Sequence, residues 1–150
     1  MTWLAVAALA LPFLAFVLAL GIVVRAVSDN GLASAAGHLL PHGSSLPALL
    51  GVAAFAAVLA NVINNLPAVL VLLPIAALSG PGAVLAALIG VNIGPNLTYV
   101  GSLATLLWRR IVHAHDEETD IGEFTRLGAR TVPPILLLST LALWLALQVV

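Results

Sequence analysis

Charged residues and cysteine are what this sequence has least of. The 150-residue chain contains no cysteine, and 7% of its residues are charged, whereas a soluble globular domain has about 25%. The absence of cysteine excludes disulfides, thiolate metal sites and thiol catalysis within the chain. The formal net charge is −1, which excludes the basic surface that binding to nucleic acid requires.

Apolar residues, by contrast, make up 62% of the chain. A surface of this composition is stable in a lipid bilayer rather than in water. Helices satisfy their own backbone hydrogen bonds, which lipid cannot do for them. The composition therefore predicts an all-α, multi-pass protein of the cell membrane, with the lipid bilayer as its first partner.

The two ends of the chain are expected to span the membrane. Residues 1–24 contain no charged residue and are long enough to cross a hydrocarbon core of about 30 Å. No basic residue precedes this run, and it exceeds the length of a signal-peptide core, so a spanning helix is favoured over a secretory signal. Residues 25–45 mix polar and apolar residues, which is typical of a short interfacial helix and a loop. Residues 131–150 form the last predicted span.

Residues 46–79 are also uncharged, but a polar sequence, Asn61-Val-Ile-Asn64-Asn65-Leu-Pro67, interrupts them. Neither apolar limb reaches the roughly 20 residues of a crossing helix. Two short limbs with a polar turn predict a re-entrant helical hairpin, which enters the membrane and returns to the same side. The alternative is one long kinked helix whose asparagines bond to neighbouring helices.

Residues 82–112 contain a second interruption. Proline lacks a backbone N–H and restricts the residue before it, so Pro95 predicts that the helix breaks near Gly94 to Thr98. A broken membrane helix exposes backbone groups and helix ends, and many transporters bind their substrates there. The residues expected to line this break are Asn92, Gly94, Asn96, Thr98, Gly101 and Ser102.

The segment 113–130 is the most hydrophilic part of the chain. Four of the five arginines flank it, so the positive-inside rule places this loop in the cytoplasm. Its histidines and carboxylates are explained by a solvated loop. Neither they nor the pair His38 and His42 are expected to bind a metal, because a metal site requires several converging ligands. We expect no metal and no cofactor.

The two interruptions carry a family resemblance. The motifs Asn61-Val-Ile-Asn-Asn-Leu-Pro-Ala68 and Val91-Asn-Ile-Gly-Pro-Asn-Leu-Thr98, with Gly101-Ser-Leu-Ala-Thr-Leu-Leu-Trp108, resemble the carboxy-terminal portion of the bacterial arsenite efflux permeases. These permeases are members of the ion transporter superfamily, in which two inverted repeats each supply a re-entrant hairpin and a broken helix to a shared site. The resemblance extends from about residue 13 to the end of the chain. It implies that Asn64, Asn65 and Pro67 belong to the hairpin tip, and that Gly94, Asn96, Thr98, Gly101 and Ser102 belong to the broken helix.

The resemblance implies a permease that exports arsenite or antimonite by alternating access, as a secondary active transporter and not an enzyme. Arsenite is largely an uncharged trihydroxide at neutral pH, so carboxamides, hydroxyls and backbone dipoles suffice to hold it. The same groups also suit Na⁺ or a carboxylate. A dicarboxylate or citrate carrier, or a sodium/proton carrier, is therefore the first alternative. The second is a non-transporting fragment or subunit, whose asparagines serve helix packing.

Partners follow from the same resemblance. Proteins of this family are much longer, and this sequence shows one hairpin and one broken helix. We therefore expect a fragment, a split-gene product or a subunit, which needs the missing amino-terminal half or another copy to complete a two-walled site. A cytoplasmic arsenite-stimulated ATPase that docks on the loop 113–130 is a further candidate partner.

Overall fold

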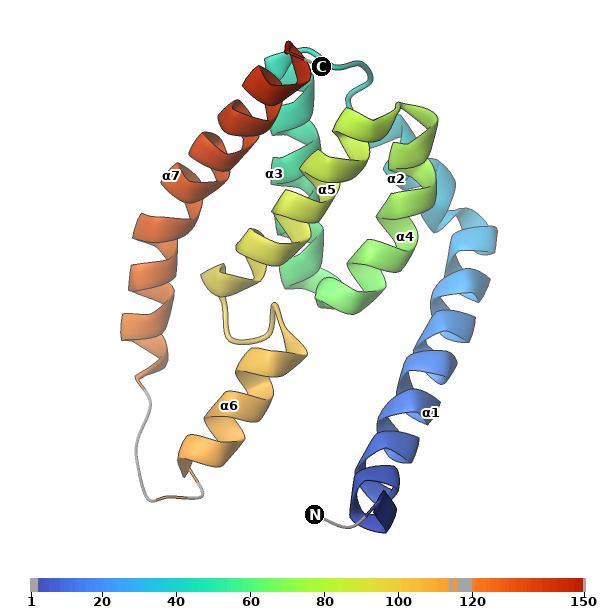
Figure 1. Ribbon diagram of the computed structural model, residues 1–150, viewed down its shortest axis with the longest axis vertical. Helices are drawn as coiled ribbons and strands as arrows, with labels where there is room; N and C mark the ends of the chain where they lie inside the picture. The colour runs from blue at the N-terminus through green and yellow to red at the C-terminus, as the bar shows by residue number, and fades with distance from the viewer. Residues whose placement is uncertain (1–2, 114, 116–119, 150) are drawn as a thin grey trace.

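The computed structural model describes residues 3–113, 115 and 120–149, and within these ranges the chain is helical and has no strand. In chain order the helices are α1 (Trp3–Val27), α2 (Ala33–Leu39), α3 (Leu46–Ile63), α4 (Asn65–Leu78), α5 (Pro81–Ile93), α6 (Leu103–His113) and α7 (Ile121–Leu147). A kink at Ser28–Leu32, where Asn30 and Gly31 leave the helical conformation, separates α1 from α2, and a 3-10 turn, Gly94–Leu97, follows α5. The predicted all-α class is confirmed (Figure 1).

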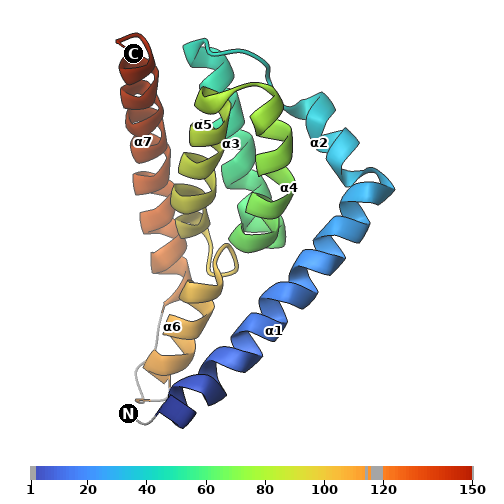
Figure 2. The same ribbon diagram turned by 45° about the vertical axis from the view of Figure 1, so that its right-hand side comes forward.

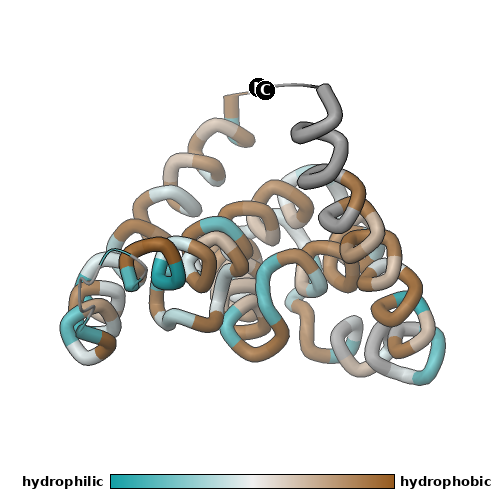
Figure 3. The backbone as a smooth tube through the Cα atoms, turned by 90° about the horizontal axis from the view of Figure 1, so that it is seen from below, coloured by the Kyte–Doolittle hydropathy of each residue, from teal (hydrophilic) through white to brown (hydrophobic). Residues whose placement is uncertain are grey.

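The helices carry the apolar surface of a membrane protein. Within the described ranges, three segments are long and apolar enough to cross a membrane: Leu14–Gly31, Leu46–Ile63 and Ile121–Leu147. Seen from one end of the molecule, apolar residues occupy most of the backbone (Figure 3). Leu18 and Ile22 of α1 are 70% and 71% exposed. Contiguous apolar exposure of this kind destabilises a protein in water but not in lipid.

Small side chains bring α3 and α5 close together. Ala53 and Ala56 of α3 are fully buried, and they lie against Gly90 of α5, where a Cβ atom would meet the Ala53 carbonyl oxygen. Gly94, just after α5, is in similarly close contact with Ala57. Small residues allow the backbones of membrane helices to approach each other closely. This packing fixes the end of α5 against the middle of α3.

The segments α3 and α4 form a helical hairpin, as predicted, and not a single kinked helix. The chain reverses at Asn64, so that α3 and α4 lie side by side and antiparallel (Figures 1 and 2). The tip lies at mid-height in the molecule, beside the chain that leaves α5, whereas α1 and α6 extend beyond it (Figure 1). The position of the tip supports a re-entrant hairpin, and its relation to the membrane remains a prediction.

The predicted break in residues 82–112 is also confirmed. Helix α5 ends at Ile93, and the 3-10 turn leads to Thr98, whose backbone is extended with φ −137° and ψ 156°. Pro95 has no N–H to continue the helical bonding, which explains why α5 ends here. Helix α6 then continues toward the end of the molecule where the N-terminus lies (Figure 2).

The last helix begins earlier than the sequence predicts. Helix α7 starts at Ile121, so the second half of the predicted loop 113–130 is helical. Asp120 explains this start, because its Oδ1 accepts hydrogen bonds from the backbone N–H groups of Gly122 (2.7 Å) and Glu123 (3.2 Å), as an N-cap residue does. The two consecutive prolines expected at the start of the span lie inside α7 instead.

Substitution of Gly90 tests the close packing of α3 and α5. Gly90→Ala is expected to lower the free energy of unfolding by about 2 kcal/mol, because the added methyl group collides with backbone that cannot move aside. Unfolding in detergent, followed by tryptophan fluorescence, measures the change. Gly37→Ala is the control, since a Cβ atom there meets its nearest neighbour, Ile75, at 3.8 Å. Equal stability of the two variants would contradict the packing.

Candidate functional site

Asn61 joins the hairpin to the helix break. Its Oδ1 accepts a hydrogen bond of 2.7 Å from the Thr98 hydroxyl. Its Nδ2 donates to the carbonyl oxygens of Ala57 and Gly94, each at 2.8 Å. One carboxamide therefore bonds to its own helix, to the end of α5 and to the extended segment after it.

The tip makes further bonds to the same segment. The Asn64 side chain donates from Nδ2 to the Val100 carbonyl at 3.2 Å, and the backbone N–H of Asn65 donates to the Gly101 carbonyl at 3.1 Å. Gly101 must lack a side chain, because a Cβ atom there would lie 2.8 Å from the Asn61 Oδ1. We call the hydrogen bonds that join Asn61, Asn64 and Asn65 to residues 94–101 the latch.

Asn64 has a backbone conformation that an asparagine seldom adopts. Its φ of 76° and ψ of 155° lie in a region that is almost exclusive to glycine and costs about 1–3 kcal/mol. The bond from its side chain to Val100 offsets part of this cost. Its carbonyl also accepts a bond from the N–H of Ala68 at 3.2 Å. Of these two contacts, the side-chain bond to Val100 is the one that glycine could not supply.

The side-chain oxygen of Asn65 takes no part in the latch. This atom, Oδ1, is buried and has no hydrogen-bond donor among the described residues. Asn65 and Ser102 line a cavity of about 320 Å³, with Leu66, Leu103, Ala104 and Leu107. The Ser102 hydroxyl oxygen accepts from the Ala104 N–H at 3.1 Å, which leaves its O–H free to donate. Two polar residues, one with an acceptor that lacks a donor and one with a free O–H, thus line a largely apolar cavity.

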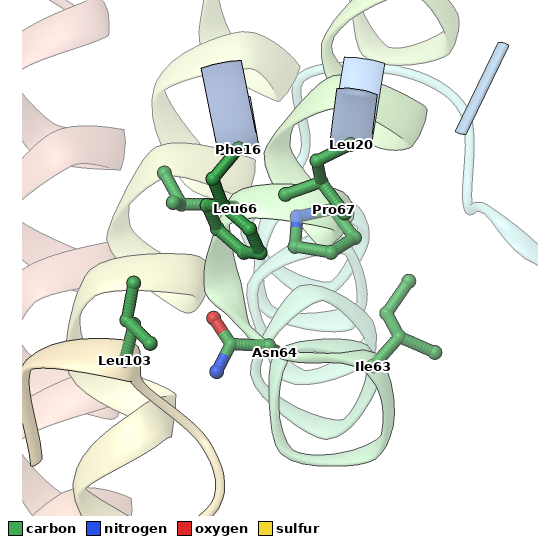
Figure 4. A pocket seen from close by; sticks show the side chains of 7 residues that line it. All are labelled: Phe16, Leu20, Ile63, Asn64, Leu66, Pro67 and Leu103. Atoms are coloured by element: carbon green, nitrogen blue, oxygen red, sulfur yellow. The ribbon is translucent and has the colours of Figure 1, made fainter. Parts of the chain in front are cut away.

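A smaller cavity of about 200 Å³ lies on the α1 side of the tip. Phe16 and Leu20 of α1 lie over Leu66 and Pro67, while Asn64 lies opposite Leu103 (Figure 4). Leu66 and Leu103 line both cavities. The hairpin tip therefore has a cavity on each side of this leucine pair.

Two predicted site residues do not reach the tip. Asn92 and Asn96 are exposed, and their side chains bond within their own segment: Asn92 to the Leu88 carbonyl at 2.8 Å, and Asn96 to the Ile93 carbonyl at 3.0 Å. Asn92 lines a separate cavity between α5 and α7. A role for these two side chains in binding stays a prediction.

An aromatic cluster that the sequence reasoning did not identify holds the break from the other side. Tyr99 is buried, and its ring centroid lies 4.4 Å from that of Phe124 and 6.5 Å from that of Trp108. The guanidinium of Arg109 lies over the Tyr99 ring, 5.6 Å from its centroid, a cation–π geometry. Because Tyr99 follows Thr98 directly, this cluster positions the hydroxyl that bonds to Asn61.

Gly128 of α7 is a second contact that the sequence reasoning missed. A Cβ atom at Gly128 would collide with the Asn96 carbonyl oxygen, so α7 touches the backbone of the break directly. The sequence reasoning placed Gly128 in a loop. The signal that could have corrected it is the capping pattern Asp120-Ile-Gly-Glu123, which starts a helix at Ile121, ten residues before the predicted span begins at residue 131.

Metal ligands do not gather in the described part of the chain. No three histidine, aspartate or glutamate side chains converge in the ranges that the structure covers. The Nδ1 of His42 donates to the Leu40 carbonyl at 2.8 Å. Asp116 and Glu117, which the sequence places near His113, lie outside the described residues.

Comparison with known proteins agrees with the motifs of the tip and the break. The model of the family described as "Arsenical pump membrane protein" matches residues 4–147. The chain belongs to this family. It is 33% identical over 143 residues to an arsenical pump membrane protein of Yersinia enterocolitica, a match that covers 89% of this chain and 33% of that protein. It is 32% identical over 136 residues to one of Escherichia coli K12, covering 84% of this chain and 28% of that protein.

The chain therefore spans about a third of the length of the curated relatives it matches. The predicted resemblance to arsenite efflux permeases is confirmed at the level of the family. These relatives are named as membrane pumps and not as enzymes. No solved structure matches the chain.

Removal of the Thr98 hydroxyl tests the latch of this arsenical pump family member. Thr98→Val is expected to lower the free energy of unfolding by about 1 kcal/mol, because the Asn61 oxygen then loses its donor inside the protein. Thr98→Ser keeps the hydroxyl and should retain most of the stability. Asn92→Ala is the control, since that side chain bonds only to its own helix in the described structure. A loss at position 92 as large as that in Thr98→Val would argue against the latch.

Proposed function

We propose that this chain forms one wall of the pathway of a pump that exports arsenite and antimonite, with its substrate site in the cavity beside Asn65. The observation that carries the proposal is that Asn65, whose buried oxygen has no donor among the described residues, lines one cavity together with Ser102. A buried acceptor without a donor costs about 1–3 kcal/mol. A bound substrate that supplies a donor would recover this free energy.

The chemistry of the cavity suits a neutral hydroxide. Each hydroxyl group of arsenite or antimonite both donates and accepts, so the hydroxyl groups of one substrate molecule would donate to Asn65 and accept from Ser102. Apolar residues line the rest of the cavity, which disfavours an ion that keeps its full charge. No charged side chain is among the residues that line it. These features support a neutral substrate over a dicarboxylate or a sodium ion.

The latch gives the other polar residues a different role in this proposal. Asn61 and Thr98 bond to each other and to backbone, so they hold the hairpin and the break together instead of binding substrate. Gly94 and Gly101 fit tight contacts, and they permit close approach more than they provide backbone freedom. In alternating access, the hairpin tip and the break would then move as one rigid unit.

Family membership favours an arsenical substrate over the carboxylate and cation carriers of the superfamily. Because the chain covers about a third of its relatives, the second wall of the site would come from the missing amino-terminal half or from another copy. The segment 113–130 would face the cytoplasm, where an arsenite-stimulated ATPase could dock. Secondary active coupling is part of the proposal.

Arsenite accumulation tests this assignment. Efflux-deficient cells would express the chain alone, and together with the part of the Escherichia coli relative that it does not match. We expect export to require Asn65, with about a tenfold lower rate in Asn65→Leu, which corresponds to the loss of one hydrogen bond to the substrate. Unlike Thr98→Val, Asn65→Leu should not lower the stability of the protein, because it removes a buried acceptor that has no donor.

Asn92→Leu is the matched control, because it makes the same substitution outside the latch and outside this cavity. It is expected to export at the parent rate. Export at the parent rate by Asn65→Leu would exclude Asn65 as a substrate ligand. Unchanged arsenite accumulation in both settings, with the protein present in the membrane, would favour a non-transporting subunit.

A further inference from the structure

A cavity between α1 and α4 lies away from the latch. Its volume is about 310 Å³. The residues that line it include Gly21, Val24, Arg25, Asp29, Val71 and Ile75. Helix α1 runs past α4 and extends beyond it toward the N-terminus (Figure 2). Val24 and Val71 are buried and pack with Ile75. The cavity therefore has an apolar floor.

Gly21 leaves the space in this cavity open. A Cβ atom at Gly21 would meet no other atom within 4 Å, and the glycine is inside a helix, where alanine would be about 1 kcal/mol more favourable. A side chain here would extend into the cavity and reduce its volume. The cavity is thus a place where a flexible apolar chain can lie against the protein.

An ion pair lies at the rim of the same cavity. Arg25 Nε and Asp29 Oδ2 are 3.0 Å apart, and the two side chains are 80% and 58% exposed. This bond occupies one donor of the guanidinium and one oxygen of the carboxylate. The Arg25 Nη groups and the Asp29 Oδ1 remain able to bond to another molecule. The rim therefore presents a positive and a negative group side by side.

We propose that this cavity binds a phospholipid with a zwitterionic aminoethyl headgroup. Charge complementarity identifies the occupant: the lipid phosphate would bond to Arg25, its primary ammonium to Asp29, and one acyl chain would lie past Gly21 on the Val24 and Val71 floor. A choline headgroup has the same charges but no N–H donor. An anionic glycerol headgroup has no cation for Asp29. The site distinguishes these three lipids.

The test is lipid retention by the purified full chain. The delipidated protein in detergent is mixed with equal amounts of phosphatidylethanolamine, phosphatidylcholine and phosphatidylglycerol that have identical acyl chains, and native mass spectrometry measures the bound lipid. We expect phosphatidylethanolamine to be retained about fivefold over each of the others, as one charged contact at a membrane surface provides. Equal retention of the three lipids, or preference for phosphatidylglycerol, would overturn the proposal.

Two substitutions test the headgroup contact and the acyl-chain contact separately. Asp29→Asn should abolish the preference over phosphatidylcholine, and Gly21→Leu should remove retention of all three lipids by filling the cavity. Ala19→Leu on the exposed side of α1 and Arg110→Gln near the end of α6 are the controls, and both should bind as the parent does. Retention by Gly21→Leu at the parent level would exclude the cavity. Displacement of the lipid by free phosphoethanolamine or inorganic phosphate would show that the rim binds a soluble phosphate, and would contradict a lipid site.

Discussion

The carboxamide of Asn61 is the interaction on which the centre of this protein depends. Within lipid, backbone groups that leave a helix have no solvent to bond to, and here two helices end side by side. Asn61 supplies the missing partners: it donates to the Gly94 carbonyl at the end of α5 and accepts from Thr98 in the segment that follows. A single neutral side chain can do this because a carboxamide both donates and accepts. A carboxylate or an ammonium would leave one of these groups unpaired.

This bridge is possible because small residues surround it. Gly90 and Gly94 allow α5 and the turn after it to touch the backbone of α3, which brings the Gly94 carbonyl within reach of Asn61. Gly101 fits beside the Asn61 oxygen, and Gly128 lets α7 contact the break from the opposite side. The main role of these glycines is therefore to permit close packing, and not to make the backbone flexible. They convert two interrupted segments into one tightly joined unit.

The sequence predicted the elements better than their contacts. The hairpin and the break could be predicted because Pro95 and the asparagines interrupt uncharged runs, and lipid tolerates such interruptions only where protein satisfies them. The start of α7 was missed because the charged residues after Asp120 resembled a loop, although Asp120 caps a helix. Which asparagines meet could not be predicted, because Asn61 and Asn92 have similar polar surroundings in sequence. The two asparagines differ in which face of its helix each one occupies: the face with Asn61 packs against the break, and the face with Asn92 does not.

Some carboxamides at the tip have hydrogen-bond partners within the protein and one oxygen does not, and this difference decides which of them could gain a bond from a substrate. A side chain that already has its partners gains little from a substrate, whereas a buried acceptor without a donor gains a full hydrogen bond. Asn61 belongs to the first kind and Asn65 to the second. Four residues of sequence thus separate a carboxamide that joins the hairpin to the break from one whose oxygen has no donor among the described residues. Since Asn65 also donates its backbone N–H to Gly101, a substrate bound to its side chain, as proposed, would act on a residue that itself joins the hairpin to the break.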